Sequence, residues 1–293
     1  MSRADAGPLQ ACDLLLATDL TARCDRATDR AIALARGGTG RAVAVHAVEP
    51  VVRPTSVLAR HDLPGWYTEP DDAQLARRQL EREFEASARA WELNVGQGRA
   101  GDYVSSLLDA MDDPLVVTGP VREAALGPVL LGSTVDSLLR RPHTRLLMVK
   151  QRVHRPYRRL LMACDFSEAC RAALLRARAL FPDAPMTVLH GYTVPMLGLL
   201  DSTRDQALAE AAAQLREEGR AFLRETGFDD DQVQLLVEHG DPARLVQQYL
   251  DSVGADLVVL GTHGRGAIHE LVVGSVARRM LATVQGDLLV INE

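Results

Sequence analysis

The sequence has few cysteines and few aromatic residues, and these shortages narrow the class of protein. Four cysteines occur in 293 residues, and none has the C-x-x-C spacing typical of metal sites. We therefore expect a reduced chain, as is usual in the cytoplasm. Aromatic residues make up 4% and the formal net charge is −6. A nucleic-acid-binding protein normally has a basic face and stacking aromatics, so we expect no nucleic-acid partner.

Long apolar runs are also missing. A membrane span needs about 18 or more apolar residues in succession, and no stretch of the sequence approaches that length. The first ten residues, M-S-R-A-D-A-G-P-L-Q, lack the apolar centre of a signal peptide. We therefore expect a cytoplasmic chain that is neither secreted nor inserted into a membrane.

The sequence does contain an internal repeat. Residues 115–133 read L-V-V-T-G-P-V-R-E-A-A-L-G-P-V-L-L-G-S, and residues 257–275 read L-V-V-L-G-T-H-G-R-G-A-I-H-E-L-V-V-G-S. Residues 14–24, L-L-L-A-T-D-L-T-A-R-C, likewise match residues 160–170, L-L-M-A-C-D-F-S-E-A-C. An internal duplication of this kind indicates two domains of similar structure.

Each copy is about 145 residues long, which is enough for a core that folds without disulfides or metals. We expect two domains, at 1–152 and 153–293. Four arginines lie near their junction, where a solvated linker is favoured over a patch for a polyanion: Arg152, Arg155, Arg158 and Arg159.

Apolar runs and amphipathic segments alternate along the second copy. Strands are predicted at 159–163, 186–190, 233–238, 257–260 and 288–291, and helices at 167–180, 201–226, 242–253 and from 275 onwards. Continuous apolar strands that alternate with helices indicate a parallel sheet covered on both faces. The predicted fold is therefore α/β, with two tandem doubly wound sheets of five parallel strands each.

The glycines after residues 257–260 suit a phosphate. Gly261, Gly264 and Gly274 allow positive φ and close backbone approach, and Ser275 opens a helix whose first N–H groups have no partner within the helix. The bland interpretation is a tight connection in which the glycines only serve packing. The position after a buried strand favours the binding interpretation.

Two further residues follow strands of the same predicted sheet. Asp165 comes after the first strand and Gly191 after the second, so both are expected near Gly261 at a topological switch point. Asp165, or alternatively Ser167, is also suited to cap the helix that follows.

These motifs resemble those of the universal stress protein family, in particular its members with two tandem domains. The resemblance covers nearly the whole chain. It rests on the strand end Ala163 to Ser167, the strand end at His190, the turn Gly240-Asp241-Pro242, and the spacing Gly261-x2-Gly264-x9-Gly274-Ser275. It implies a Rossmann-like fold of the adenine nucleotide alpha-hydrolase type and, in nucleotide-binding members, ATP held without a Walker lysine.

By this resemblance the second half contains a site for ATP with Mg²⁺. The implied binding residues are Ala163, Cys164, Asp165, Gly191, Leu260, Gly261, His263, Gly264, Arg265, Gly274, Ser275 and Val276. Asp165 and Gly191 are expected near the nucleoside, the glycine loop with Arg265 along the phosphates, and the residues from Gly274 onwards as N–H donors. Ala163 and Cys164 stand where the family commonly has Pro and Thr.

The first copy keeps most of the matching positions, namely Asp19, Ala47, Gly119, Gly132 and Ser133. Arg122, however, stands where the second copy has Gly264, and Pro120 precedes it. A non-glycine residue in the left-handed conformation costs about 1–2 kcal/mol, so this loop is expected to take another path. We expect a degenerate first site.

The resemblance also implies how the halves meet. Domains of this family pair through edge strands, so residues 145–149 and 288–291 are expected to join the halves as an intramolecular pseudo-dimer. The sequence leaves open whether a second copy of the chain assembles as a homodimer.

Several residues have both a functional and a structural interpretation. A zinc site is suggested by three histidines, but their spacing fits no known closed site, and we expect no metal: His239, His263 and His269. His46 and His190 end equivalent strands and are expected to be structural. Cys24 and Cys170 stand where a thiol can have a lowered pKa, but packing as small hydrophobes is favoured over redox sensing.

The favoured function is a non-catalytic stress-response regulator that binds ATP in its second domain and signals by occupancy. Ser275 has no His-Asp relay, and we expect no catalytic residue. One alternative is a nucleotide-free scaffold with sites for a protein partner on residues 51–70 and 192–200. Another is an adenylyl-transferring enzyme of the wider alpha-hydrolase group, whose S-G-G-x-D-S and H-x-G-H motifs are missing here.

Overall fold

The computed structural model describes residues 12–36, 38–49, 71–120, 132–194, 204–229, 231–262 and 273–292. In the described part of the first half, strands alternate with helices. The strands are β1 (Leu14–Ala17), β2 (Ala42–Val48), β3 (Glu92–Gln97), β4 (Leu115–Thr118) and β5 (Thr144–Met148), and the helices are α1 (Asp25–Ala35), α2 (Asp72–Phe84), α3 (Ala100–Leu108) and α4 (Ser133–Arg140).

The second half repeats this order. Its strands are β6 (Leu160–Ala163), β7 (Met186–Tyr192), β8 (Val233–His239), β9 (Leu257–Gly261) and β10 (Leu288–Asn292), and its helices are α5 (Glu168–Leu180), α6 (Arg204–Glu225), α7 (Pro242–Ser252) and α8 (Ser275–Thr283). Every strand and helix predicted for this half is confirmed, with ends that differ by a few residues. The predicted beginning of α6, at 201–203, lies outside the described residues.

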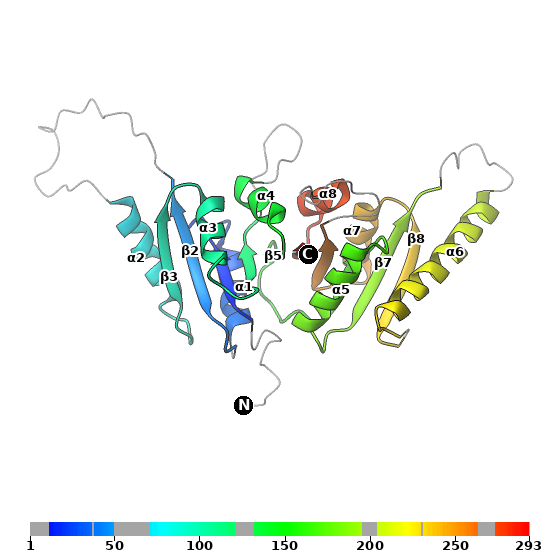
Figure 1. The fold of residues 1–293 in the computed structure, drawn as a ribbon, viewed down its shortest axis with the longest axis horizontal. Coiled ribbons are helices and arrows are strands. Elements are labelled where there is room, and N and C mark those ends of the chain that lie inside the picture. Colours follow the sequence, from blue (N-terminus) through cyan, green and yellow to red (C-terminus); the bar gives the residue numbers. More distant parts are fainter. Residues whose placement is uncertain are drawn as a thin grey trace, which may run out of the picture.

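All ten strands form one sheet, in the order β3-β2-β1-β4-β5-β10-β9-β6-β7-β8. Neighbouring strands are parallel within each half. At the centre β5 and β10 pair antiparallel, with Leu146 opposite Val290. Figure 1 shows the halves as two similar units on either side of this junction. The predicted fold class and the pseudo-dimer through edge strands are both confirmed.

Helices cover the sheet on both faces because its strands are apolar on both. In β10, Leu289 and Ile291 belong to one buried cluster, whereas Leu288 and Val290 belong to the other. Successive side chains of a strand point to opposite faces, which explains this alternation. Both clusters contain residues from both halves, so apolar packing crosses the junction on each face.

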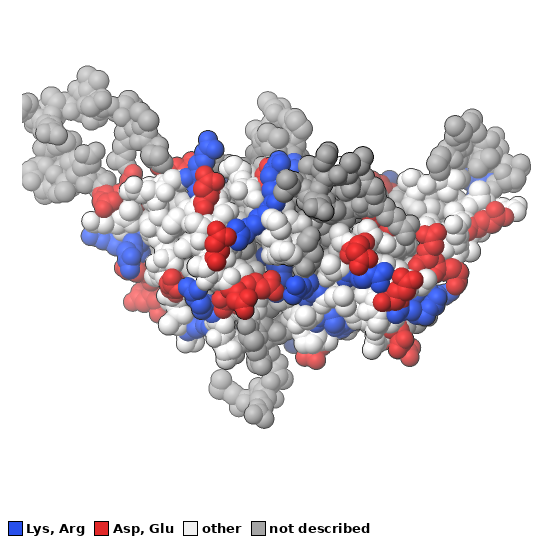
Figure 2. All heavy atoms as spheres, viewed as in Figure 1, with Lys and Arg blue, Asp and Glu red and all other residues white. Residues whose placement is uncertain are grey.

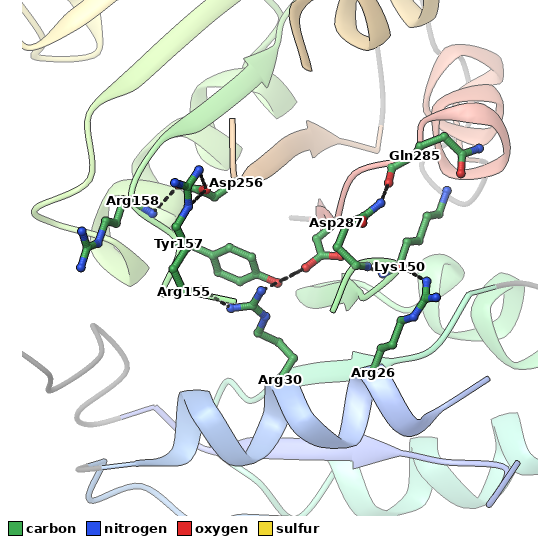
Figure 3. Close-up of polar contacts among 10 residues, drawn as sticks. Arg26, Arg30, Lys150, Arg155, Tyr157, Arg158, Asp256, Gln285 and Asp287 are labelled. Carbon is green, nitrogen blue, oxygen red and sulfur yellow. Dashed lines mark hydrogen bonds and ion pairs between the residues drawn. The ribbon is translucent and has the colours of Figure 1, made fainter. Parts of the chain in front are cut away.

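The segment between β5 and β6 is tied down by two carboxylates of the second half. Asp287 is 1% exposed and accepts hydrogen bonds from the Lys150 and Gln151 amides and from the Tyr157 hydroxyl. The Arg30 guanidinium, from α1 of the first half, lies 3.7 Å from the same carboxylate and 4.1 Å above the Tyr157 ring. Figure 3 shows these groups pointing toward one another.

Asp256 holds the arginine-rich part of this segment. It forms an ion pair of 2.8 Å with Arg155 and accepts hydrogen bonds from the Arg158 and Arg159 amides, each at 2.9 Å. The segment expected to be a solvated linker therefore has a defined path along the second half.

On the face drawn in Figure 2, acidic and basic side chains are interspersed. Within the described ranges, no helix has both the length and the apolar character needed to cross a bilayer.

Candidate functional site

A cavity of about 420 Å³ opens where β6, β7 and β9 end, beside the beginnings of α5, α7 and α8. The sheet order places β6 next to β9, with their chain connections leaving in opposite directions, and ligands of doubly wound sheets bind at such a switch point. Nine of the sequence-predicted residues line this cavity: Ala163, Cys164, Asp165, Gly191, Leu260, Gly261, Gly274, Ser275 and Val276.

The other predicted residues fall outside the part of the chain that the structure describes. These are His263, Gly264 and Arg265, together with His269 of the zinc hypothesis and Arg122 of the first copy. Residues 51–70 and 195–200, where partner sites were predicted, also lie outside it.

A tight turn positions Asp165 on the cavity wall. Its Oδ1 accepts a hydrogen bond of 3.1 Å from the Ser167 amide, and Phe166 between them adopts the left-handed conformation with φ 61°. Ser167 is the N-cap of α5, because its side chain accepts from the Cys170 amide. Of the two caps predicted, Ser167 is therefore confirmed and Asp165 is wrong: the carboxylate closes the turn before the helix.

His190 has a structural role in the same wall. Its Nδ1 lies 2.8 Å from the Cys164 carbonyl oxygen, and its ring stacks on Phe166 with centroids 4.5 Å apart. His46 makes the equivalent contact in the first half, with 2.9 Å between its Nδ1 and the Thr18 carbonyl oxygen. Both histidines thus have the structural contacts expected of them, and His190 also lines the cavity.

The cavity glycines serve close approach. A Cβ on Gly261 would lie 3.1 Å from the Ala169 carbonyl oxygen, and a Cβ on Gly274 would lie 3.3 Å from that of Thr262. Neither is among the described glycines with positive φ, and Gly274 has φ −57°. For these two glycines the expectation of close backbone approach is confirmed and that of positive φ is wrong; Gly264 lies outside the described residues.

Helix α8 points its N-terminal end at the cavity. Gly274 is the N-cap, and Ser275 and Val276 form the first turn and line the cavity. The N-terminal end of a helix carries partial positive charge and N–H groups without intrahelical partners, which together attract anions. The Gly274 amide itself donates to the Thr262 carbonyl at 2.8 Å, so it packs the turn instead of serving as the expected ligand donor.

The cysteines differ from the expectation of a fully reduced chain. Cys164 and Cys170 form a disulfide, with Cα atoms 5.8 Å apart, and both line the cavity. Cys12 and Cys24 are free. The turn at Phe166 brings Cys164 and Cys170, six positions apart, to bonding distance. The spacing of the cysteines in the sequence did not predict this bond. The expectation of a reduced chain is thus wrong for this pair, although Cys170 is buried in an apolar cluster, as expected of a small hydrophobe.

Sequence reasoning also missed the apolar floor of the cavity, which is formed by Leu189, Val246, Ala277 and Met280. The helix periodicity of α7 and α8 places such residues toward the sheet, and core residues were the natural interpretation. These side chains do belong to a buried apolar cluster, and at the strand ends they also line the cavity. An apolar floor with few polar groups is typical of small-molecule pockets.

The first half has the same turn, but its cysteine, Cys24, is a free thiol. Burial alone would raise the pKa of Asp19, but hydrogen bonds from the Thr21 hydroxyl and amide and from the Cys24 thiol lower it overall. Burial raises the pKa of Cys24 to about 11. Cys24 is thus a neutral buried thiol, as expected of a small hydrophobe.

The fold and the cavity define a doubly wound α/β protein of two tandem units with a cavity at a switch point. A model of the universal stress protein family matches residues 13–150 and 156–292, and the chain belongs to this family, with two tandem domains.

Individual relatives agree. A universal stress protein of Mycolicibacterium smegmatis is 29% identical over 206 residues, which cover 66% of this chain and 67% of that protein. A universal stress protein from Thermus aquaticus is 30% identical over 141 residues, which cover 46% of this chain and 99% of that protein. The crystal structure of a universal stress protein from Archaeoglobus fulgidus superposes with a TM-score of 0.64 at 16% identity, over 97% of this chain and 98% of that one. This last likeness concerns the fold alone.

Proposed function

We propose that this protein binds ATP in its second domain and acts as a non-catalytic stress-response regulator that signals by occupancy. The observation that carries the proposal is the cavity between β6 and β9, with an apolar floor at one side and the first turn of α8 at the other. Members of the family often bind adenine nucleotides and are mostly non-catalytic.

The described residues fit the parts of a nucleotide. The floor of Val246 and Met280 suits a flat apolar base, and the Asp165 carboxylate is an acceptor for sugar hydroxyls. The first turn of α8 suits phosphate oxygens, as do the sequence-predicted residues Gly264 and Arg265. Mg²⁺ would be held chiefly by phosphate and water oxygens, as is usual for nucleotide-bound magnesium.

The proposal is asymmetric between the halves. The second copy has Gly264 where the first has Arg122, and a phosphate-binding loop needs the freedom that glycine gives. The first domain would then be a degenerate partner, joined to the second through β5 and β10. A cytoplasmic location is part of the same proposal.

Isothermal titration of ATP with Mg²⁺ into the whole protein tests the function. We expect one site per chain, weakened at least about tenfold by Asp165→Ala and unchanged by the matched Asp19→Ala. The exchange variants Gly264→Arg and Arg122→Gly should respectively abolish the site and leave it intact.

Each of the remaining outcomes of this titration would favour a different function. No heat from the wild type overturns the proposal in favour of the nucleotide-free scaffold. Two sites, or a site lost with Asp19→Ala, overturns the asymmetry. Saturable turnover of ATP that disappears in Asp165→Ala overturns the non-catalytic role.

A further inference from the structure

A disulfide forms part of the cavity wall beside Asp165, the carboxylate that is predicted to bind the ligand. Cys164 follows the end of β6, and Cys170 lies in the first turn of α5. Both sulfur-bearing residues line the cavity, although they are only 7% and 2% exposed overall. The covalent loop between them contains Asp165, so the disulfide links the strand end next to Asp165 to the first turn of α5.

The first half shows that this turn forms without a disulfide. At the position of Cys164 it has Thr18, and at that of Cys170 it has the free thiol of Cys24. Leu20 is left-handed like Phe166, with φ 57°, and Asp19 Oδ1 accepts from the Thr21 amide at 2.9 Å. Reduction of the disulfide in the second half should therefore leave the fold of the turn intact.

The two halves differ in what the helix-start sulfur can donate. In the first half the Cys24 thiol helps to lower the pKa of the Asp19 carboxylate. A disulfide sulfur has no hydrogen, so Cys170 cannot donate to Asp165 while it is bonded to Cys164. Once reduced, Cys170 has a thiol proton and can interact with the Asp165 carboxylate, as the Cys24 thiol does with that of Asp19. A ligand hydroxyl would then compete with this thiol.

Reduction also removes a covalent restraint from the wall. A wall held in its binding conformation loses less conformational freedom when a ligand is bound, which favours affinity. Both effects, the restraint and the missing thiol donor, act in the same direction.

We propose that the Cys164–Cys170 disulfide is a redox switch of the ligand cavity and that the oxidised form binds nucleotide more tightly than the reduced form. This inference rests on the proposed function, because it concerns the regulation of the same site. If the protein is cytoplasmic, a disulfide there is usually transient or redox-sensing, which agrees with such a role.

The reaction partner is a low-molecular-weight thiol, RSH, and its disulfide, RSSR. The thiolate RS⁻ attacks one protein sulfur, the S–S bond breaks, and a mixed disulfide forms while the second protein sulfur leaves as a thiolate. A second RS⁻ displaces the first protein sulfur and releases RSSR. The two protons from the two RSH molecules end on Cys164 and Cys170, and the reverse reaction uses RSSR as the oxidant.

Thermodynamic linkage adds a second signature. If the oxidised form binds ATP more tightly, then ATP must favour the oxidised form by the same factor. Nucleotide in the cavity would also shield the sulfurs, whose accessible side is the cavity wall.

The test compares oxidised and reduced whole protein. Thiol titration after denaturation should count two free thiols after treatment with a small disulfide and four after reduction. ATP titration should give a dissociation constant at least about fivefold higher for the reduced form. Saturating Mg²⁺-ATP should shift the thiol–disulfide equilibrium toward the disulfide by the same factor.

Variants separate the two effects. Cys164→Ala keeps the Cys170 thiol and should bind ATP like the reduced wild type, whereas Cys170→Ala has neither thiol nor disulfide there and should bind with intermediate affinity. Both should be insensitive to reductant. Cys24→Ala, the matched control in the first half, should keep the full redox response.

The outcomes are distinguishable. Equal ATP affinity in both redox states overturns the switch and leaves the proposed function standing. Four free thiols after treatment with the small disulfide overturn it as well. Binding in neither state overturns the proposed function and the switch together.

Discussion

At the scale of single residues, the repeat supplies a control for each site residue. Gly119 and Gly261 end equivalent strands, and an added Cβ would lie 3.0 Å from the Arg23 carbonyl oxygen in one case and 3.1 Å from that of Ala169 in the other. The steric problem is the same in both halves. A functional difference between the two positions must therefore come from the ligand.

We expect Gly261→Ala and Gly119→Ala each to lower the free energy of unfolding by about 1–3 kcal/mol, the usual cost of overpacking. Only Gly261→Ala should weaken ATP binding, by about tenfold or more, because it shifts the backbone at the cavity. Urea denaturation and calorimetric titration measure the two quantities. Comparable losses of ATP affinity in both variants would contradict the asymmetric site.

Burial gives the Cys24 thiol a second testable property. With its pKa raised to about 11, about one molecule in a thousand has the thiolate at pH 8, against about a quarter for an unperturbed cysteine. We expect alkylation of Cys24 to be about a hundredfold slower in the folded than in the urea-unfolded protein. Its rate should still rise about tenfold per pH unit between pH 8 and 10. A plateau below pH 9, detected by peptide mass mapping, would show that the thiol is not buried in this way.

The residues that sequence reasoning could and could not identify differ in physical kind. Asp165 and Gly261 were predictable because strand ends converge at one edge of a parallel sheet, whatever the side-chain details. The Cys164–Cys170 pair was not, because its formation depends on the left-handed Phe166, a backbone feature that residue type does not announce. The satisfied Gly274 amide was equally out of reach, since its acceptor, Thr262, is set by the path of the chain.

At the scale of helices and strands, the clearest difference between equivalent elements is at the beginnings of α1 and α5. Ser167 caps α5 with its side chain, whereas the N-cap of α1 is Cys24, which makes no side-chain capping bond. Thr21, at the position of Ser167, instead donates its hydroxyl to Asp19 at 2.7 Å. The same turn therefore uses its hydroxyl in two ways.

We expect Ser167→Ala to lower the free energy of unfolding by about 1 kcal/mol, because it leaves a helix N–H without its acceptor. Thr21→Ala removes an exposed bond that no helix depends on and should cost less. Chemical denaturation of both variants under oxidising conditions measures the difference. Equal costs would mean that the side-chain cap contributes nothing to α5.

The order of the elements was almost fully predictable because each signal is local. Apolar runs such as Leu257–Leu260 are buried on both faces, and the turn at Gly240 with Pro242 at the first position of α7 fixes a helix start. Pairing of β5 with β10 came from family resemblance. Its register, with Leu146 opposite Val290, depends on contacts between segments over a hundred residues apart.

At the scale of the whole molecule, the linker breaks the symmetry of the two halves. Arg30 in α1 and Arg176 in α5 occupy equivalent positions. Arg30 stacks on the Tyr157 ring beside the buried Asp287, whereas Arg176 pairs at 3.3 Å with Asp113, which is 40% exposed. The segment between the halves packs on Arg30, whereas Arg176 pairs with a residue of the first half. No local sequence pattern could have predicted that Asp287 holds the segment between β5 and β6 in place.

Asp287 should therefore be the side chain on which the attachment of the two halves depends most. Removing one partner of a buried ion pair leaves the other charge without compensation, which costs about 3–5 kcal/mol. Asp287→Ala leaves Arg30 in this state and should lower the free energy of unfolding by about that amount. Tyr157→Phe removes one of the hydrogen bonds and should cost about 1–2 kcal/mol. Asp287→Asn keeps an acceptor for the Lys150 and Gln151 amides but loses the charge, and it should fall between the two. Both halves contribute to this polar cluster and to both apolar clusters, so the wild type should unfold in one calorimetric transition. Asp287→Ala should unfold in a broader or divided transition. If this variant lost less than about 1 kcal/mol of unfolding free energy and kept a single sharp transition, the β5–β10 pairing would hold the halves together without the Asp287 carboxylate.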